Sequence, residues 1–354
     1  MLHVGLDLSR TRLDVHVMDE SGRSVLESVA PVDAEGLGGF AAEIDARFGE
    51  PVRAVVESMT GARHVYDVLS EHGWQVQVAD AAKARAFAPV ACKTDKADAK
   101  VLATYSWRDL VPAIWLPPLS IRQARELGRC RAHLVKHRTM LKNRIHSVLM
   151  NFGVPRAESD LFGKAGRDRL AALPVPEPWA GHITETVTLI DDLDARIDAV
   201  EAQMGTWGKD RPDVQHLRTV PGIGLVLGTM IAAEIGDIAR FASPTKLVGY
   251  TGLCPKVYQS GNTDRRGPLT KHGPKFLRWA LIEAAVHASQ YPPFAVKYQR
   301  TVKRLGPKRG DRGRRIARVE VARHLAGVIW HMLSNDEDFG PAPGGAARDL
   351  AARA

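Results

Sequence analysis

The sequence predicts an α/β N-terminal domain, a helical coiled-coil middle region and a mostly α-helical C-terminal domain. Short alternating apolar segments dominate roughly the first hundred residues, whereas long stretches of helical periodicity dominate the rest. A chain of 354 residues is also too long for one small domain. We therefore divide it into domains at 1–112, 113–210 and 211–335, followed by a Gly-, Ala- and Pro-rich tail at 336–354 that we expect to be disordered.

The N-terminal domain is predicted to hold a mixed β-sheet. Three short strands are separated by tight connections, after which helices and strands alternate. We expect strands at 2–8, 11–18, 23–30, 52–57 and 74–79, and helices at about 33–48 and 61–72. This order, β-β-β-α-β-α-β, implies that helices cover the faces of the sheet.

Four carboxylates of this domain are candidate metal ligands. Asp7 lies inside an apolar strand, where a carboxylate is costly unless it is paired or binds a cation. Glu57 ends the fourth strand, and Asp95 and Asp98 share one face of a predicted helix. Carboxylates suit Mg²⁺, and two such ions about 4 Å apart can activate a nucleophile and stabilise the leaving oxygen of a phosphodiester. The alternative is that these are ordinary surface acids.

Charge is distributed unevenly along the chain. The formal net charge is +9. Residues 1–112 hold 12 Lys and Arg against 17 Asp and Glu, a net charge of −5, whereas residues 113–354 hold 37 against 23, a net charge of +14. An acidic first part and a basic remainder should have different roles, and the basic part indicates a polyanionic partner.

Other features exclude several classes of protein. No apolar run is long enough to span a membrane, and Asp7 interrupts the apolar N-terminal stretch, which argues against a signal peptide. Cys92, Cys130 and Cys254 are too far apart in sequence for a disulfide framework or a zinc motif. We therefore expect a cytoplasmic protein with no membrane partner.

The middle region is predicted to form two long helices. Apolar spacing indicates a helix at 119–150 and a second at 181–205, with irregular chain at 151–180. Whether the two helices pair within one chain or across a dimer stays open. The first helix carries many cations against one acid, Glu126, which favours phosphate contacts by Arg122, Arg125, Arg129, Lys136, Arg138, Lys142 and Arg144.

A glycine-rich turn and a polar loop follow. The turn that contains Gly222 and Gly224 resembles a helix-hairpin-helix, whose backbone N–H groups bind DNA phosphate; the alternative is a tight turn between packed helices. Residues 254–274 are expected to form a loop in which Ser260 could attack a phosphate, although most serines in turns are only polar. The cations around this serine are Arg265, Arg266, Lys271 and Lys275.

Residues 297–318 form the most basic segment, with ten Lys and Arg and one acid, Asp311. Its glycines indicate a flexible or ligand-ordered loop that binds a polyanion, before an amphipathic helix at 316–333. The candidate contacts in this segment are Arg304, Lys308, Arg309, Arg312, Arg314 and Arg315.

Several motifs together resemble one protein family. GLDLSR, VVESMTG and KTDKADA have the order of a RuvC-like DEDD domain, which has an RNase H-like fold. PGIG, KLVGYTGLCP, QSG and LTKHGPKFLRWAL resemble the C-terminal serine domain of bacterial transposases of insertion-sequence family one-ten, which are related to Piv-type DNA invertases. The resemblance covers about residues 2–107 and 215–333, which includes both motif sets. Many members carry Ser-Ser-Gly where this chain has Gln259-Ser260-Gly261.

The resemblance implies a recombinase with a composite active site. Asp7, Glu57, Asp95 and Asp98 would hold Mg²⁺, and Ser260 would attack DNA and become a transient phosphoserine. Family members form tetramers and use a bridge RNA that pairs with donor and target DNA. We therefore expect both DNAs, a structured non-coding guide RNA and a dimeric or tetrameric assembly as partners, in the bacterial cytoplasm at the nucleoid.

Two rival functions stay open. The first is a RuvC-like two-metal nuclease of the junction-resolvase type, which uses the four acids and forms no covalent intermediate. The second is a non-catalytic scaffold that binds nucleic acid and whose acids are vestigial.

Overall fold

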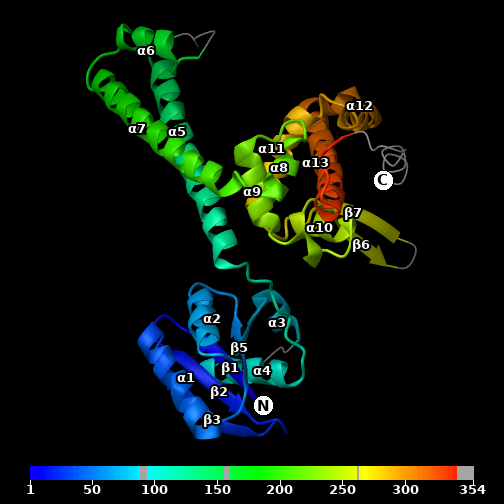
Figure 1. Ribbon diagram of the computed structural model, residues 1–354. Coiled ribbons are helices and arrows are strands. Elements are labelled where there is room, and N and C mark those ends of the chain that lie inside the picture. The colour runs from blue at the N-terminus through cyan, green and yellow to red at the C-terminus, as the bar shows by residue number, and fades with distance from the viewer. Residues whose placement is uncertain (88–93, 155–159, 261–262, 341–354) are drawn as a thin grey trace. The chain divides into compact units, whose positions relative to one another are not determined.

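A computed structural model describes residues 1–340 except 88–93, 155–159 and 261–262 (Figure 1). It divides into two units, Met1–Leu116 and Pro117–Ala354, which are described separately below as unit 1 and unit 2. Most of the tail that we expected to be disordered lies outside the described residues.

Unit 1 is built on a five-stranded mixed sheet with the order β3-β2-β1-β4-β5. The first three strands are antiparallel, whereas β1, β4 and β5 run parallel. This confirms the predicted mixed sheet, and each predicted strand is present. The strands span Leu2–Leu8 (β1), Leu13–Met18 (β2), Ser24–Ala30 (β3), Val52–Glu57 (β4) and Gln75–Ala79 (β5).

Helices cover both faces of this sheet. Leu37 and Ile44 of α1 and Leu69 of α2 are fully buried in one apolar cluster with alternate residues of β1 and β2. On the opposite face α4 packs along β1, β2 and β4. The helices span Ala34–Phe48 (α1), Ala62–Glu71 (α2), Ala81–Phe87 (α3) and Asp95–Trp107 (α4).

The contact between α4 and β1 depends on a glycine. A Cβ atom on Gly5 would lie 1.8 Å from the carbonyl oxygen of Ala99 and 2.4 Å from the backbone nitrogen of Ala103, so no other residue fits there. Near the start of β1, Nδ1 of His3 lies 3.0 Å from Oγ of Ser106. The helix therefore runs antiparallel to β1, and its first turn lies beside the end of the strand.

Unit 2 is largely helical and contains one two-stranded sheet among its described residues. Helices α5 and α7 pack against each other within the chain, and α9 packs on both. The α-helices span Leu119–Asn151 (α5), Lys164–Ala171 (α6), Trp179–Gly208 (α7), Pro212–Arg218 (α8), Leu225–Ile235 (α9), Pro244–Thr251 (α10), Lys275–Ala288 (α11), Phe294–Leu305 (α12) and Gly310–Asn335 (α13), with 3₁₀ turns at Ile238–Arg240 (η1) and Pro307–Arg309 (η2).

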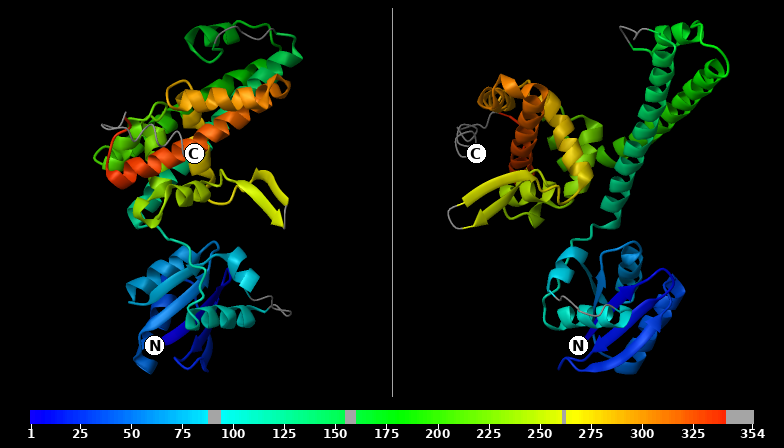
Figure 2. Two further views of the ribbon diagram at one scale, coloured as in Figure 1. Left: turned by 90° about the vertical axis from the view of Figure 1, so that its right-hand side faces the viewer. Right: turned by 180° about the vertical axis from the view of Figure 1, so that it is seen from behind.

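Three predictions of irregular structure in this unit were wrong. The loop expected at 254–274 contains an antiparallel hairpin, β6 (Pro255–Ser260) and β7 (Thr263–Leu269), which projects from the helices in Figures 1 and 2. The loop expected at 297–318 is mostly helical, because Lys and Arg are good helix formers and Phe294 and Thr301 bury one side of α12. The segment 151–180 includes α6, which buries Leu170.

Within the described residues, no helix combines the length and apolar character needed to cross a membrane.

Replacing Gly5 with Ala should destabilise unit 1, because the added methyl group meets backbone atoms that cannot rotate away. We expect a cost of about 3 kcal/mol or more, an overpacking penalty at the upper end of the usual range. Gly39 on the exposed face of α1 is the matched control, since nothing lies within 4 Å of its added Cβ. Thermal unfolding of both variants checks this, and similar melting temperatures for the two would contradict the packing at Gly5.

Candidate active site

The predicted acids gather at one end of β1 in unit 1. Leu6 of β1 pairs with Val56 of β4, so Asp7 and Glu57 are the next residues on two neighbouring parallel strands. The first turn of α4 supplies Asp95 and Asp98, and Thr94 caps that turn by accepting a hydrogen bond from the N–H of Ala97. Three separate elements thus bring the four predicted acids together.

The pKa of Asp7 is affected by the charges of the other acids. Burial and then the negative charges of Asp98, Asp95, Glu57 and Asp14 raise the pKa of Asp7 from its ordinary value to about 6. Each of the four charges disfavours ionisation of Asp7, so all four carboxylates lie near enough to act on it. A cation in their midst would relieve that repulsion.

Asp14 belongs to this cluster, although we did not select it from the sequence. It is the cross-strand partner of Asp7, is 2% exposed and lies 3.0 Å from Nε of Arg12. The signal that marked Asp7 was present here too, because Asp14 is also an acid within an apolar strand, between Leu13 and Val15.

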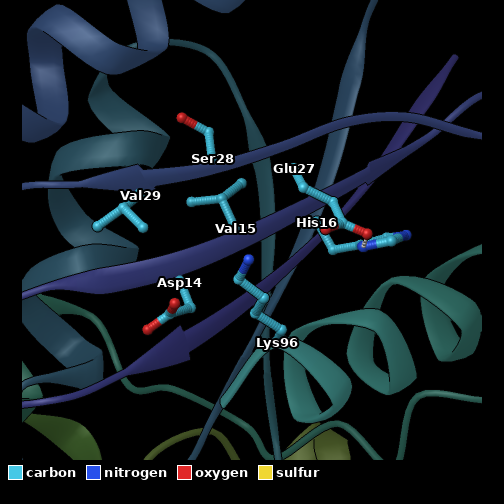
Figure 3. A pocket seen from close by; sticks show the side chains of 7 residues that line it. All are labelled: Asp14, Val15, His16, Glu27, Ser28, Val29 and Lys96. Atoms are coloured by element: carbon cyan, nitrogen blue, oxygen red, sulfur yellow. Dashed lines mark ion pairs between the residues drawn. The ribbon is translucent and has the colours of Figure 1, made fainter. Parts of the chain in front are cut away.

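A shallow pocket adjoins Asp14 on strands β2 and β3 of the sheet (Figure 3). Its polar lining includes the buried ring of His16, whose Nε2 lies 2.9 Å from Oγ of Ser24 and whose Nδ1 lies 3.5 Å from Oε1 of Glu27. Burial lowers the pKa of His16. The pocket is lined by Asp14, Val15, His16, Glu27, Ser28, Val29 and Lys96.

The acid cluster fits a divalent cation in the chemistry of its donors, since all of them are carboxylates. Among the described residues, however, no three His, Cys, Asp or Glu side chains lie close enough to ligate one metal ion. Two arginines lie among the acids instead. Arg12 approaches Asp95 at 3.4 Å, and Arg85 lies 3.8 Å from Glu57.

In unit 2, Ser260 lies at the end of β6, at the tip of the hairpin. Its side chain is exposed, and it pairs across the hairpin with Thr263. The next two residues, Gly261 and Asn262, lie outside the described residues.

The turn between α8 and α9 serves at least in part for packing. Gly222 has a φ of +88°, and a Cβ atom there would lie 2.8 Å from the carbonyl oxygen of Ala284 on α11. The tight-turn alternative therefore explains Gly222. Gly224 precedes the first residue of α9 and has open space around it, so its predicted phosphate contact stays a prediction.

Two of the predicted cations of α5 lie beside Glu234 of α9. Arg125 donates hydrogen bonds of 2.8 Å to the backbone carbonyls of Ala233 and Glu234, and its side chain is 11% exposed. Arg129 lies 3.5 Å from the buried carboxylate of Glu234. Arg125 is thus committed to the interior, which corrects its assignment to phosphate binding.

Other predicted cations of α5 also have partners within unit 2. Arg138 forms an ion pair with Asp194, and the ammonium of Lys142 lies 4.8 Å from the ring centre of Phe162. Arg122 is partly buried. The remaining predicted cations are exposed and stay candidates for phosphate contacts: Lys136, Arg144, Arg265, Arg266, Lys271, Lys275, Arg304, Lys308, Arg309, Arg312, Arg314 and Arg315.

Two family models match the chain at these sites. Residues 4–153, which include the acid cluster, match a DEDD-type transposase model, and residues 214–299, which include the hairpin, match the model for the transposase IS116/IS110/IS902 family. The chain thus contains both domains of this type of transposase. It is therefore an enzyme of DNA transposition or recombination, and its DEDD-type domain implies a general dependence on a divalent metal.

Individual relatives of this transposase cover most of its length. It is 26% identical to the transposase for insertion sequence element IS1328 of Yersinia enterocolitica, across 80% of this chain and 82% of the relative. It is also 26% identical to the IS1111A transposase of Coxiella burnetii, across 80% and 78%. A pilin gene-inverting protein of Moraxella bovis is 27% identical across 70% of this chain and 68% of its own length.

Asp7→Asn should raise the melting temperature of the metal-free transposase at about pH 7.5. The pKa of Asp7 is raised to about 6 in the folded state, so the free energy of unfolding falls as the pH rises from the ordinary pKa of an aspartate through about 6. The Asn side chain cannot ionise, so the variant does not lose this stability. The gain should disappear below about pH 3, where Asp7 is mostly protonated in both the folded and the unfolded state. Glu43→Gln, at an exposed position of α1, is the control. A gain of equal size at both pH values would contradict the assignment.

Lys308→Ala combined with Arg309→Ala should weaken binding to mixed-sequence duplex DNA and reduce its salt dependence. Loss of two phosphate contacts should lower the slope of log affinity against log salt by about 2. Arg196→Ala is the control, because Arg196 is exposed on α7 but paired with Asp192. Fluorescence anisotropy over a salt series measures both, and equal slopes for the parent and the double variant would show that these two cations are only solvated.

Proposed function

We propose that this transposase cuts and rejoins DNA through a covalent serine–phosphate intermediate, with Ser260 as the nucleophile. The observation that carries the proposal is the raised pKa of Asp7, which the charges of Glu57, Asp95 and Asp98 help to raise. The second family match of the chain contains an exposed serine at a hairpin tip. In this proposal both groups act on the same DNA phosphate.

Unit 1 would supply an RNase H-like metal site for this reaction. Asp7, Glu57, Asp95 and Asp98 would hold Mg²⁺, expected as two ions, and the bound metal would polarise the phosphate and offset its charge. The sheet register holds Asp7 and Glu57 side by side, and the packing of α4 at Gly5 holds the other two acids. Each carboxylate is therefore fixed by backbone structure rather than by a mobile loop.

Ser260 would carry the DNA between cutting and rejoining. The Oγ–phosphorus bond forms as the bond from phosphorus to the departing DNA oxygen breaks, the serine proton passes to a base, and the departing oxygen takes up a proton. Attack by a DNA hydroxyl on the phosphoserine reverses these changes and restores the serine. No oxidant or nucleotide cofactor is required, because the phosphodiester energy is kept in the intermediate.

One relative favours rejoining over cutting alone. The Moraxella bovis protein is named for inverting a pilin gene, and inversion of a gene requires that cut ends be joined again. A plain two-metal nuclease would leave the ends free. This comparison supports the recombinase proposal over the nuclease alternative.

Guide RNA and a dimeric or tetrameric assembly complete the proposal. The exposed cations of α12, η2 and α13 suit phosphates, which do not differ between sequences. Choice of sequence by base pairing with an RNA is compatible with such a surface.

Ser260→Ala should retain nucleic-acid binding and lose all recombination. The parental transposase, trapped during reaction in Mg²⁺, should give a protein–DNA adduct that survives SDS and maps to the peptide containing Ser260. Asp7→Asn, Asp95→Ala and Asp98→Ala should each fail to form it, and combining the last two should add little, because parts of one catalytic unit are not additive.

The adduct also separates the alternatives. Metal-dependent cleavage by the parental protein without any adduct would favour the two-metal nuclease, and binding without cleavage would favour the scaffold. An adduct at Tyr258 or Thr263, or normal recombination by Ser260→Ala, would falsify the serine assignment.

A further inference from the structure

We propose that the face of the β6–β7 hairpin that carries Ser260 is a platform for a single DNA strand, on which Tyr258 stacks against a base and Arg265 holds a phosphate. The identity of the bound strand rests on the proposed function of Ser260. The platform itself rests on the hairpin register, on one glycine and on the distribution of charge.

Strand alternation divides the hairpin into two faces. Successive residues of a strand point to opposite sides, so Lys256, Tyr258 and Ser260 share one face of β6. Tyr258 pairs with Arg265 across the hairpin, which places Arg265 on that same face. Val257 pairs with Arg266, so these two residues define the opposite face.

A glycine lets the Tyr258 ring lie against the hairpin. A Cβ atom on Gly267 would lie 2.9 Å from Cε2 of Tyr258, so any other residue at 267 would push the ring away. The ring is nonetheless 57% exposed. Tyr258 is thus supported by the neighbouring strand while much of its surface faces solvent, which is the arrangement that aromatic platforms use to stack bases.

Charge distinguishes the two faces. Arg266 on the opposite face is held by Asp264 at 2.9 Å. Lys256 and Arg265 on the Ser260 face are exposed, and neither forms an ion pair with any described residue. The Ser260 face therefore presents positive charge beside an aromatic ring, which is complementary to a nucleic-acid strand and to its bases.

The spacing along the hairpin matches this role. Residues two apart on a strand are separated by about 6.6 Å, and diagonal cross-strand neighbours on one face have Cα atoms about 7–8 Å apart, within reach of a long side chain. Arg265 is the diagonal neighbour of Ser260, which pairs with Thr263. A phosphate at Ser260 is therefore within reach of the Arg265 guanidinium, and the adjoining base lies at Tyr258. The hairpin projects from the helices of unit 2 (Figure 2), and Lys256, Tyr258 and Ser260 are exposed, so a strand can reach this face.

Photocrosslinking tests the platform in the full-length protein. The probe is a single-stranded oligodeoxythymidine that carries one 5-iododeoxyuridine, and the Ser260→Ala background prevents turnover. We expect the crosslink to map to Tyr258. Tyr258→Ala should remove it and weaken binding of a short oligodeoxythymidine about five-fold or more, as the loss of one stacked base does, whereas Tyr258→Phe should bind like the parent.

Two matched pairs make the test specific to one face. Val257→Ala is the control for Tyr258→Ala, because Val257 is exposed on the opposite face. Arg196→Ala is the control for Arg265→Ala, because Arg196 is an exposed arginine of α7 that is paired with Asp192. Equal losses within either pair would overturn the platform, as would a crosslink that maps only outside the hairpin or that forms only with oligouridine RNA.

The outcome is independent of the covalent mechanism. A crosslink at Tyr258 in a protein whose parent never forms a Ser260 adduct would sustain the platform and reject the serine intermediate. An adduct at Ser260 with no crosslink at Tyr258 would do the reverse.

Discussion

The close contact of α4 with β1 is the constraint on which the acid cluster depends. Because Gly5 has no side chain, the backbone of the helix lies directly on the strand at Ala99 and Ala103. This contact fixes the height and direction of the helix, so its first turn lies beside the end of β1. Asp95 and Asp98 acquire their positions from a residue that carries no chemistry itself. A larger residue at position 5 would separate the two halves of the cluster without altering any acid.

The same contact concentrates negative charge, and this has an energetic consequence. Asp7 is partly withdrawn from water and faces four other carboxylates, so its ionised form is disfavoured in the folded protein. Arg12 and Arg85 offset only part of that charge. Ionisation of Asp7 therefore lowers the stability of unit 1 at neutral pH, and a bound cation would offset this loss. Such an arrangement is typical of functional sites rather than of structural ones.

Much of unit 1 could be predicted from sequence, because its information is local. Alternating apolar residues marked the strands, and an acid within an apolar strand marked Asp7. Partners from distant sequence could not be predicted in this way. In the sequence, Arg125 and Arg138 have no evident partner and were predicted to bind phosphate. In the structure, Arg125 contacts Glu234 of α9 and Arg138 forms an ion pair with Asp194 of α7. The hairpin was missed because Gly261, Gly267 and Pro268 are typical of loops. In the structure, the residues on either side of the turn pair as two strands, beginning with Ser260 and Thr263.

The uneven charge of the chain acquires a physical explanation from these sites. A carboxylate cluster repels a DNA backbone, so unit 1 alone would bind its substrate poorly at the atoms where it acts. The exposed cations of unit 2, including Lys308 and Arg309 beside η2, can supply the attraction. In the proposed mechanism most of the affinity for DNA comes from unit 2, and a cation at the acids of unit 1 serves the reaction rather than the attraction of the polyanion.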